Sequence, residues 1–154
     1  MRRMATVDLN ELRVYQLAIR VGEDVWSFVD GWSWMAKQSV GLQWIRSADS
    51  IAANIAEGYG RHSFKENAKF CYYARGSLRE SQTWLTKALN RSLIPTSEAD
   101  DLAMKFETLR RQLDNYIHSL GKPGPTTIRE SSPEFFDHEL PSLEDFLAAH
   151  APTS

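Results

Sequence analysis

Residues 43–58, QWIRSADSIAANIAEG, separate their apolar and polar side chains into two stripes. The apolar stripe consists of Trp44, Ala48, Ile51 and Ile55. The polar stripe consists of Gln43, Arg46, Ser50, Asn54 and Glu57. Because both stripes repeat every three or four residues, they predict one amphipathic helix with a core-facing side and a hydrogen-bonding side. Such a helix is typical of a helix bundle and does not indicate a catalytic pocket.

The segment before this helix shows a similar periodicity. Asp8 followed by Glu11 forms a capping-box pattern, so a helix is expected to begin there and to end near residues 30–31. Its predicted apolar stripe consists of Leu12, Tyr15, Ile19, Gly22, Trp26 and Val29. Two amphipathic helices therefore precede residue 60.

A connector is expected over residues 31–39, which contain Trp32 and Trp34. These two rings either cover a neighbouring subunit or cap their own bundle. The glycines Gly58 and Gly60 are expected to end the helix that follows the connector.

Two more helices follow a short loop. Ser63 with Glu66 forms a second capping box, and Pro95 marks the start of the last helix. The apolar stripe of the third helix consists of Phe70, Ala74, Leu78, Leu85 and Ala88 or Leu89. That of the fourth consists of Leu102, Phe106, Leu109, Leu113, Tyr116 or Ile117, and Leu120, before the breakers Gly121, Pro123 and Pro125. We predict an all-α fold, an antiparallel up-down four-helix bundle over residues 1–121.

The C-terminal segment differs in charge from this bundle. The whole chain has a net charge of −2, but residues 122–154 contain six Asp or Glu against Lys122 and Arg129. Their apolar residues are Phe135, Phe136, Leu140, Leu143, Phe146 and Leu147. We expect residues 122–154 to form an extended acidic tail that docks on a partner protein or on a neighbouring subunit.

Several function classes lack their sequence signals. The chain has one cysteine, Cys71, which excludes an intrachain disulfide and favours a cytoplasmic protein. No run of eighteen apolar residues predicts a membrane span, and no glycine-rich phosphate-binding loop is present. The four histidines share no metal-ligand spacing. We therefore expect no enzyme activity, cofactor, metal or membrane association.

The motifs of the second and third helices resemble a known family, the bacterial four-helix-bundle proteins named for the intervening sequences of 23S rRNA genes. The resemblance covers about residues 9–120 and departs from the family at Ile45, where members often have a second arginine. The matching residues are Gln43, Arg46, Ser50, Asn54, Glu57 and Gly58, then Phe70, Ala74, Ser77 and Glu80.

This resemblance implies an up-down bundle and assembly into five-fold rings. It also implies a relationship to the accessory protein of diversity-generating retroelements, in which a basic ring surface is thought to contact nucleic acid and a reverse transcriptase. The family name by itself indicates no RNA contact.

A basic stripe on the third helix is the candidate nucleic-acid interface. It consists of Arg61, Lys65, Lys69, Arg75 and Arg79, with Tyr72 and Tyr73 nearby. Cations can follow a phosphate backbone, and aromatic rings can stack on single-stranded bases. The alternative is a solvated helix face with weak surface ion pairs, such as Arg75 with Glu80. In a ring, this modest charge would be repeated in every subunit.

The polar residues of the family motif have two interpretations. Gln43, Arg46, Ser50, Asn54 and Glu57 either line an RNA groove or satisfy one another at a helix or subunit interface. The small residues Gly76, Ser77 and Ser81 are expected to allow the second and third helices to approach closely.

Two functions are consistent with these patterns. The first is a non-enzymatic homo-oligomer, pentameric by resemblance, whose basic surface binds RNA or DNA as an accessory factor. The second is a protein-interaction scaffold that docks through its acidic, Phe-rich tail.

Overall fold

The computed structural model describes residues 7–121, and its regular structure is entirely helical within that range. The four long helices are α1 (Arg13–Asp30), α3 (Leu42–Tyr59), α4 (Phe64–Asn90) and α5 (Thr96–Leu120). Three short segments accompany them: the 3-10 turn η1 (Leu9–Glu11), α2 (Trp34–Ala36) and the π-helical segment η2 (Lys37–Gly41). The predicted all-α fold is confirmed. The predicted tail, residues 122–154, lies outside the described residues.

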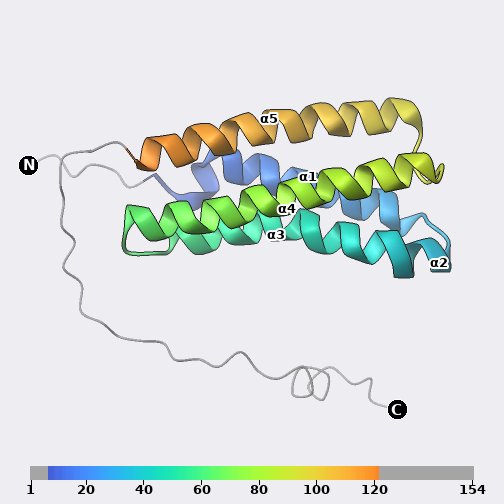
Figure 1. Ribbon diagram of the computed structural model, residues 1–154, viewed down its shortest axis with the longest axis horizontal. Helices are drawn as coiled ribbons and strands as arrows, with labels where there is room; N and C mark the ends of the chain where they lie inside the picture. Colours follow the sequence, from blue (N-terminus) through green and yellow to red (C-terminus); the bar gives the residue numbers. More distant parts are fainter. Residues whose placement is uncertain (1–6, 122–154) are drawn as a thin grey trace, which may run out of the picture.

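The four long helices pack around one common hydrophobic core. Helix α1 packs on α3 and α5, and α4 packs on the other sides of α3 and α5. Successive long helices run in opposite directions along the same axis (Figure 1). The α1/α3 and α4/α5 seams consequently lie on opposite sides of the bundle.

The centre of the core is built around Trp44 of α3. Its indole Nε1 donates a hydrogen bond to Ser81 Oγ of α4 at 3.0 Å, which satisfies a buried donor. Phe28 and Trp32 stack on the same indole, with ring centroids at 6.4 and 5.8 Å. The predicted apolar stripe of α3, including Ile51 and Ile55, is fully buried and is confirmed.

The predicted stripe of α1 is partly wrong. Ile19 is 42% exposed and Trp26 is 55% exposed. The buried stripe instead consists of Val14, Ala18, Val21, Gly22, Val25 and Val29. The physical reason is volume: large side chains of α3 and α5, such as Trp44 and Phe106, fill the core, so α1 contributes small ones.

The predicted connector over residues 31–39 is too long. Only Gly31 to Ser33 separate α1 from α2, because Ser33 Oγ accepts a hydrogen bond from the Ala36 backbone N–H at 3.4 Å. Helical geometry then continues through η2 into α3. Trp32 packs against its own core, whereas Trp34 is 77% exposed.

Two capping predictions have different outcomes. Ser63 caps α4, since its Oγ accepts a hydrogen bond from the Glu66 N–H at 3.1 Å. Asp8 caps η1, whereas α1 begins four residues later without a side-chain cap. Gly60 is the C-cap of α3, as predicted, whereas Gly58 lies inside the helix and is buried against Asn67 of α4.

None of the helices between residues 7 and 121 combines the length and apolarity that crossing a membrane requires.

Candidate nucleic-acid interface

The solvent-facing side of α4 carries a stripe without acidic residues, which we call the basic face. It consists of Lys65, Lys69, Tyr72, Gly76, Arg79, Thr83 and Lys87, all exposed and spaced by three or four residues. The opposite side of α4 is buried and includes Cys71, Ala74 and Leu78. The amphipathicity of this helix therefore places four cations in one row on the surface.

On the α3 side of the basic face, cations alternate with aromatic rings. Arg61 Cζ lies 4.7 Å from the centroid of the Phe70 ring, and Lys69 Nζ lies 6.0 Å from that of Tyr73. The two rings meet edge to face at 5.5 Å. Arg61 also forms an ion pair with Glu57, one helical turn earlier. Both cations are thus held beside aromatic rings, of which Tyr73 is exposed and Phe70 is half-buried.

On the α5 side, a shallow groove of about 450 Å³ follows the seam between α4 and α5. It is lined by Tyr72, Arg75, Gly76, Leu78, Arg79, Gln82, Arg110 and Asp114. The Arg75 guanidinium lies 5.5 Å from the centroid of the Tyr72 ring. The groove therefore combines three arginines, one aromatic ring and one carboxylate.

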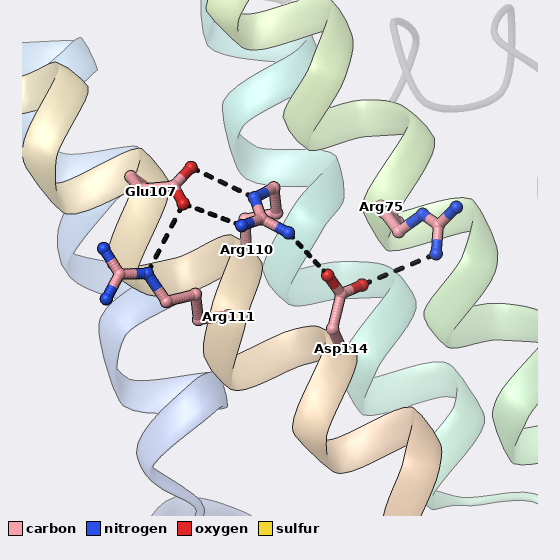
Figure 2. A network of polar contacts seen from close by, with 5 residues as sticks. All are labelled: Arg75, Glu107, Arg110, Arg111 and Asp114. Atoms are coloured by element: carbon pink, nitrogen blue, oxygen red, sulfur yellow. Dashed lines mark hydrogen bonds and ion pairs between the residues drawn. The ribbon is translucent and has the colours of Figure 1, made fainter.

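Figure 2 shows how ion pairs position two of these arginines, Arg75 and Arg110, together with Arg111. Asp114 lies between α4 and α5 and accepts hydrogen bonds from Arg110 Nη1 at 2.8 Å and from Arg75 Nη1 at 3.5 Å. Glu107 accepts two bonds from Arg110, at 2.7 and 3.0 Å, and one from Arg111 at 3.4 Å. Three guanidinium groups face two carboxylates, so the network keeps a net positive charge.

This network also shifts the pKa values of Glu107 and Arg110. The hydrogen bonds from Arg110, together with its charge and a smaller contribution from Arg111, lower the pKa of Glu107 to about 2. The same pairing raises the pKa of Arg110. Since the pairs are at the surface, they contribute little to folding stability, but they restrict the orientations of the arginines.

The structure divides the predicted nucleic-acid residues into three groups. Arg61 and Lys69 belong to the aromatic array on the α3 side, and Arg75 and Arg79 belong to the groove on the α5 side. Lys65 is exposed between them, near the start of α4. All five therefore lie around one helix, on the basic face or on its two flanks.

Two sequence-based contacts of α4 are wrong. Arg75 pairs with Asp114 on α5, whereas Glu80 accepts a hydrogen bond from its own helix, from Trp84 Nε1 at 3.2 Å. Gly76 does not lie between α3 and α4, because a Cβ added there meets no atom within 4 Å. Ser81, one turn further, has the buried position at this contact.

The polar stripe of α3 is satisfied in part within its own helix. Asn54 Nδ2 donates to the Ser50 carbonyl oxygen at 2.8 Å, and Glu57 pairs with Arg61. Gln43 and Arg46 are exposed, and Ser77 of α4 is half-buried. These contacts support the structural interpretation for Asn54 and Glu57.

Sequence reasoning missed Arg110. The only signals were local: Glu107 precedes Arg110 and Arg111 by three and four residues, and Asp114 follows Arg110 by four. This spacing indicates ion pairs within one helix. It does not reveal that Asp114 also reaches Arg75 on another helix.

A second groove lies between α1 and α3, on the opposite side of the bundle, with a volume of about 350 Å³. Small and apolar residues line most of it, including Ile19, Gly22 and Ala53. Its acidic residues are Glu23 and Asp49. Burial, and secondarily the nearby Glu23 charge, raises the pKa of Asp49. The two seams therefore differ in both charge and apolarity.

Residues 10–115, which include every long helix except the end of α5, match the family described as 23S rRNA-intervening sequence protein. The chain belongs to this family. The match confirms the resemblance seen in the motifs of α3 and α4. No curated protein matches the chain.

A solved structure supports the same fold for this member of the 23S rRNA-intervening sequence protein family. It is the crystal structure of a protein of unknown function from the S23 ribosomal protein family of Bacteroides thetaiotaomicron. The TM-score is 0.62, the sequence identity is 16%, and the similarity covers 68% of this chain and 95% of the other. At this identity, the similarity establishes the fold alone.

Proposed function

We propose that this protein is a non-enzymatic, homo-oligomeric accessory protein that binds single-stranded RNA or DNA through the basic face of α4 and its flanking rings. One observation carries the proposal: Lys65, Lys69, Arg79 and Lys87 form an exposed row without any acid in the row. The exposed surface of α4 also carries Glu66 and Glu80, but its five cations, Arg75 included, outnumber these two acids.

The chemistry of the flanks favours single strands. Tyr72 and Tyr73 are 53% and 49% exposed, so each ring has a face available for stacking on a base. The cations beside these rings neutralise phosphates and release counterions. Because Arg75 and Arg110 are already held by Asp114, less side-chain entropy is lost when they bind a phosphate.

We infer self-association from a different surface. Ile19 and Trp26 of α1, with Leu42 at the start of α3, expose large apolar side chains on the α1/α3 side. An exposed apolar surface of this kind favours association, and we assign it to a second copy of this chain. The five-fold stoichiometry comes from the family resemblance. A ring would repeat the basic face in each subunit, so that weak contacts add up to useful avidity.

Salt-dependent binding tests the proposal. We expect the full-length protein to bind a fluorescent 20-nucleotide single strand, with an affinity that falls steeply from 50 to 300 mM salt. The triple variant Lys65→Glu, Lys69→Glu and Arg79→Glu should weaken binding by about 100-fold or more, because each reversal replaces a phosphate contact with repulsion.

The matched control reverses three exposed cations away from α4, Arg13, Arg20 and Lys105, each to Glu. It changes the net charge equally and should retain most of the affinity. Equal losses in the two triple variants would indicate only a general charge effect. No salt-sensitive binding by the parent protein would refute the proposal.

A further inference from the structure

The acidic residues of the C-terminal segment are concentrated in a short stretch. Residues 130–145 contain six carboxylates and neither Lys nor Arg. The six are Glu130, Glu134, Asp137, Glu139, Glu144 and Asp145. Phe135, Phe136 and Phe146 lie among or beside them. Negative charges with interspersed aromatic rings are also the chemical pattern of a single-stranded nucleic acid, whose phosphates alternate with flat bases.

The basic face has the complementary pattern. Its cations lie in a row, and the rings of Phe64, Tyr72 and Tyr73 are exposed on the same helix. Carboxylates can pair with Lys65, Lys69 and Arg79 as phosphates would, and phenylalanine rings can pack on the exposed rings. In the described part of the chain, this is the surface whose charge and aromatic content best match residues 130–147.

The point where the chain leaves the bundle places this segment close to that surface. Helix α5 ends at Leu120, and Tyr116, one turn earlier, accepts a hydrogen bond from Asn67 Nδ2 of α4 at 3.1 Å. The end of α5 therefore lies at the same end of the bundle as the first turn of α4, which contains Lys65 (Figure 1).

The length of the connection is sufficient. Eight residues, 122–129, separate Gly121 from the first of the six acids, and an extended chain of eight residues spans roughly 28 Å. The row from Lys65 to Arg79 is about 21 Å long, at 1.5 Å per helical residue. A linker this short gives the segment an effective concentration on the order of millimolar at the basic face.

We propose that residues 130–147 bind the basic face of α4 in their own chain and compete with nucleic acid for it. This inference rests on the proposed function for the role of the competition, but the contact itself does not depend on nucleic acid. Each carboxylate that pairs with a lysine or arginine withholds that cation from a phosphate. If the segment occupies the face for nine-tenths of the time, the apparent affinity for nucleic acid falls about 10-fold.

The first test uses the full-length chain with the six carboxylates changed to their amides, Glu to Gln and Asp to Asn. We expect it to bind the 20-nucleotide strand about 10-fold more tightly than the parent at 50 mM salt. Its salt dependence should also be steeper, because nucleic acid then binds a face that carries counterions instead of carboxylates. Equal affinity and equal salt dependence would overturn the inference while the proposed function stands.

A second variant separates docking from long-range repulsion. Phe135→Ser, Phe136→Ser and Phe146→Ser keep all six charges. If the segment docks, losing the rings weakens the contact and strengthens nucleic-acid binding. If the segment only repels nucleic acid at a distance, these substitutions change nothing, and the inference is overturned.

A third measurement needs no nucleic acid. A carbodiimide joins a carboxylate to an amine only where the two are in contact, and an equal mixture of isotope-labelled and unlabelled protein distinguishes links within one chain from links between chains. We expect cross-links from Lys65 or Lys69 to residues 130–145 within one chain, lost at 1 M salt. Absence of these links, or links that join labelled to unlabelled chains, would overturn the inference even if the protein binds nucleic acid.

Discussion

At the scale of single residues, the most consequential contact is the hydrogen bond between Trp44 and Ser81. The periodicity of α3 predicted that Trp44 would be buried, but not which group accepts its indole proton. A buried N–H without a partner is costly, so the largest side chain of the core depends on a serine of another helix.

Ser81→Ala should therefore destabilise the protein by about 1–3 kcal/mol, because it removes the acceptor of a buried donor. The measurement is urea denaturation followed by tryptophan fluorescence. Ser77→Ala, at a half-buried position one turn earlier, serves as the control and should change the free energy of unfolding by less than about 0.5 kcal/mol. Equal effects of the two substitutions would show that the hydrogen bond contributes nothing.

Asp49 provides a pH-dependent prediction. Its pKa is raised in the folded protein, so the folded state binds this proton more tightly than the unfolded state does. The resulting stabilisation is complete below the unfolded pKa, about 3.9, and is lost as the pH rises through the folded value. Asp49→Asn should consequently raise the melting temperature at pH 7 and leave it nearly unchanged at pH 3. A lower melting temperature at pH 7 would contradict this assignment.

At the scale of elements, the sequence predicts most of the architecture. Ser63 and Pro95 predict where α4 and α5 begin, because caps and prolines act locally. The buried side of α1 could not be predicted in this way, because the helix has two apolar stripes. Only the space left by the neighbouring helices decides which stripe is buried. The same limit applies to Arg75, whose partner Asp114 is 39 residues away in the sequence.

Helix α3 approaches α4 closely at Gly58. A Cβ there would lie 2.8 Å from the backbone oxygen of Asn67 and 2.7 Å from its Oδ1, so Gly58→Ala must push the helices apart. We expect a loss of about 1–3 kcal/mol in urea denaturation.

Gly76→Ala on α4 is the matched control. No atom lies within 4 Å of its Cβ position, and alanine is the better helix former, so this substitution should stabilise the protein by about 0.5–1 kcal/mol. The prediction is wrong if both substitutions shift stability in the same direction.

At the scale of the whole molecule, the closed arrangement of four helices creates two unlike seams. The α4/α5 seam is rich in arginine, whereas the α1/α3 seam is apolar with two acids. The surface that we propose for nucleic acid and the surface that we propose for a neighbouring subunit therefore lie on opposite sides of the bundle.

Trp26→Glu tests this assignment. A charge in the apolar surface should disfavour association, so light scattering should show a smaller particle while circular dichroism stays helical. Lys105 lies elsewhere, paired with Asp24, and Lys105→Glu is the control that should leave the particle size unchanged. An unchanged size for Trp26→Glu would exclude this surface from the interface.

The integrity of the bundle depends on its common core. Ile55 is fully buried, so Ile55→Asp introduces an unpaired charge and should cost about 4 kcal/mol or more, which is a large part of the roughly 5–15 kcal/mol stability of an ordinary domain. Ile55→Val, which removes one methyl group, should cost about 1 kcal/mol. Thermal melts followed by circular dichroism measure both, and an unchanged melt for the aspartate variant would contradict the assigned core.

Cys71 is the one cysteine of the chain, and its thiol is fully buried between helices. Burial raises the pKa of this thiol to about 11, so at pH 8 it is both shielded and protonated. An alkylating reagent can react with it only after the helices separate. The rate of alkylation of the native protein thus reports how often the bundle opens, and it does so without any added label.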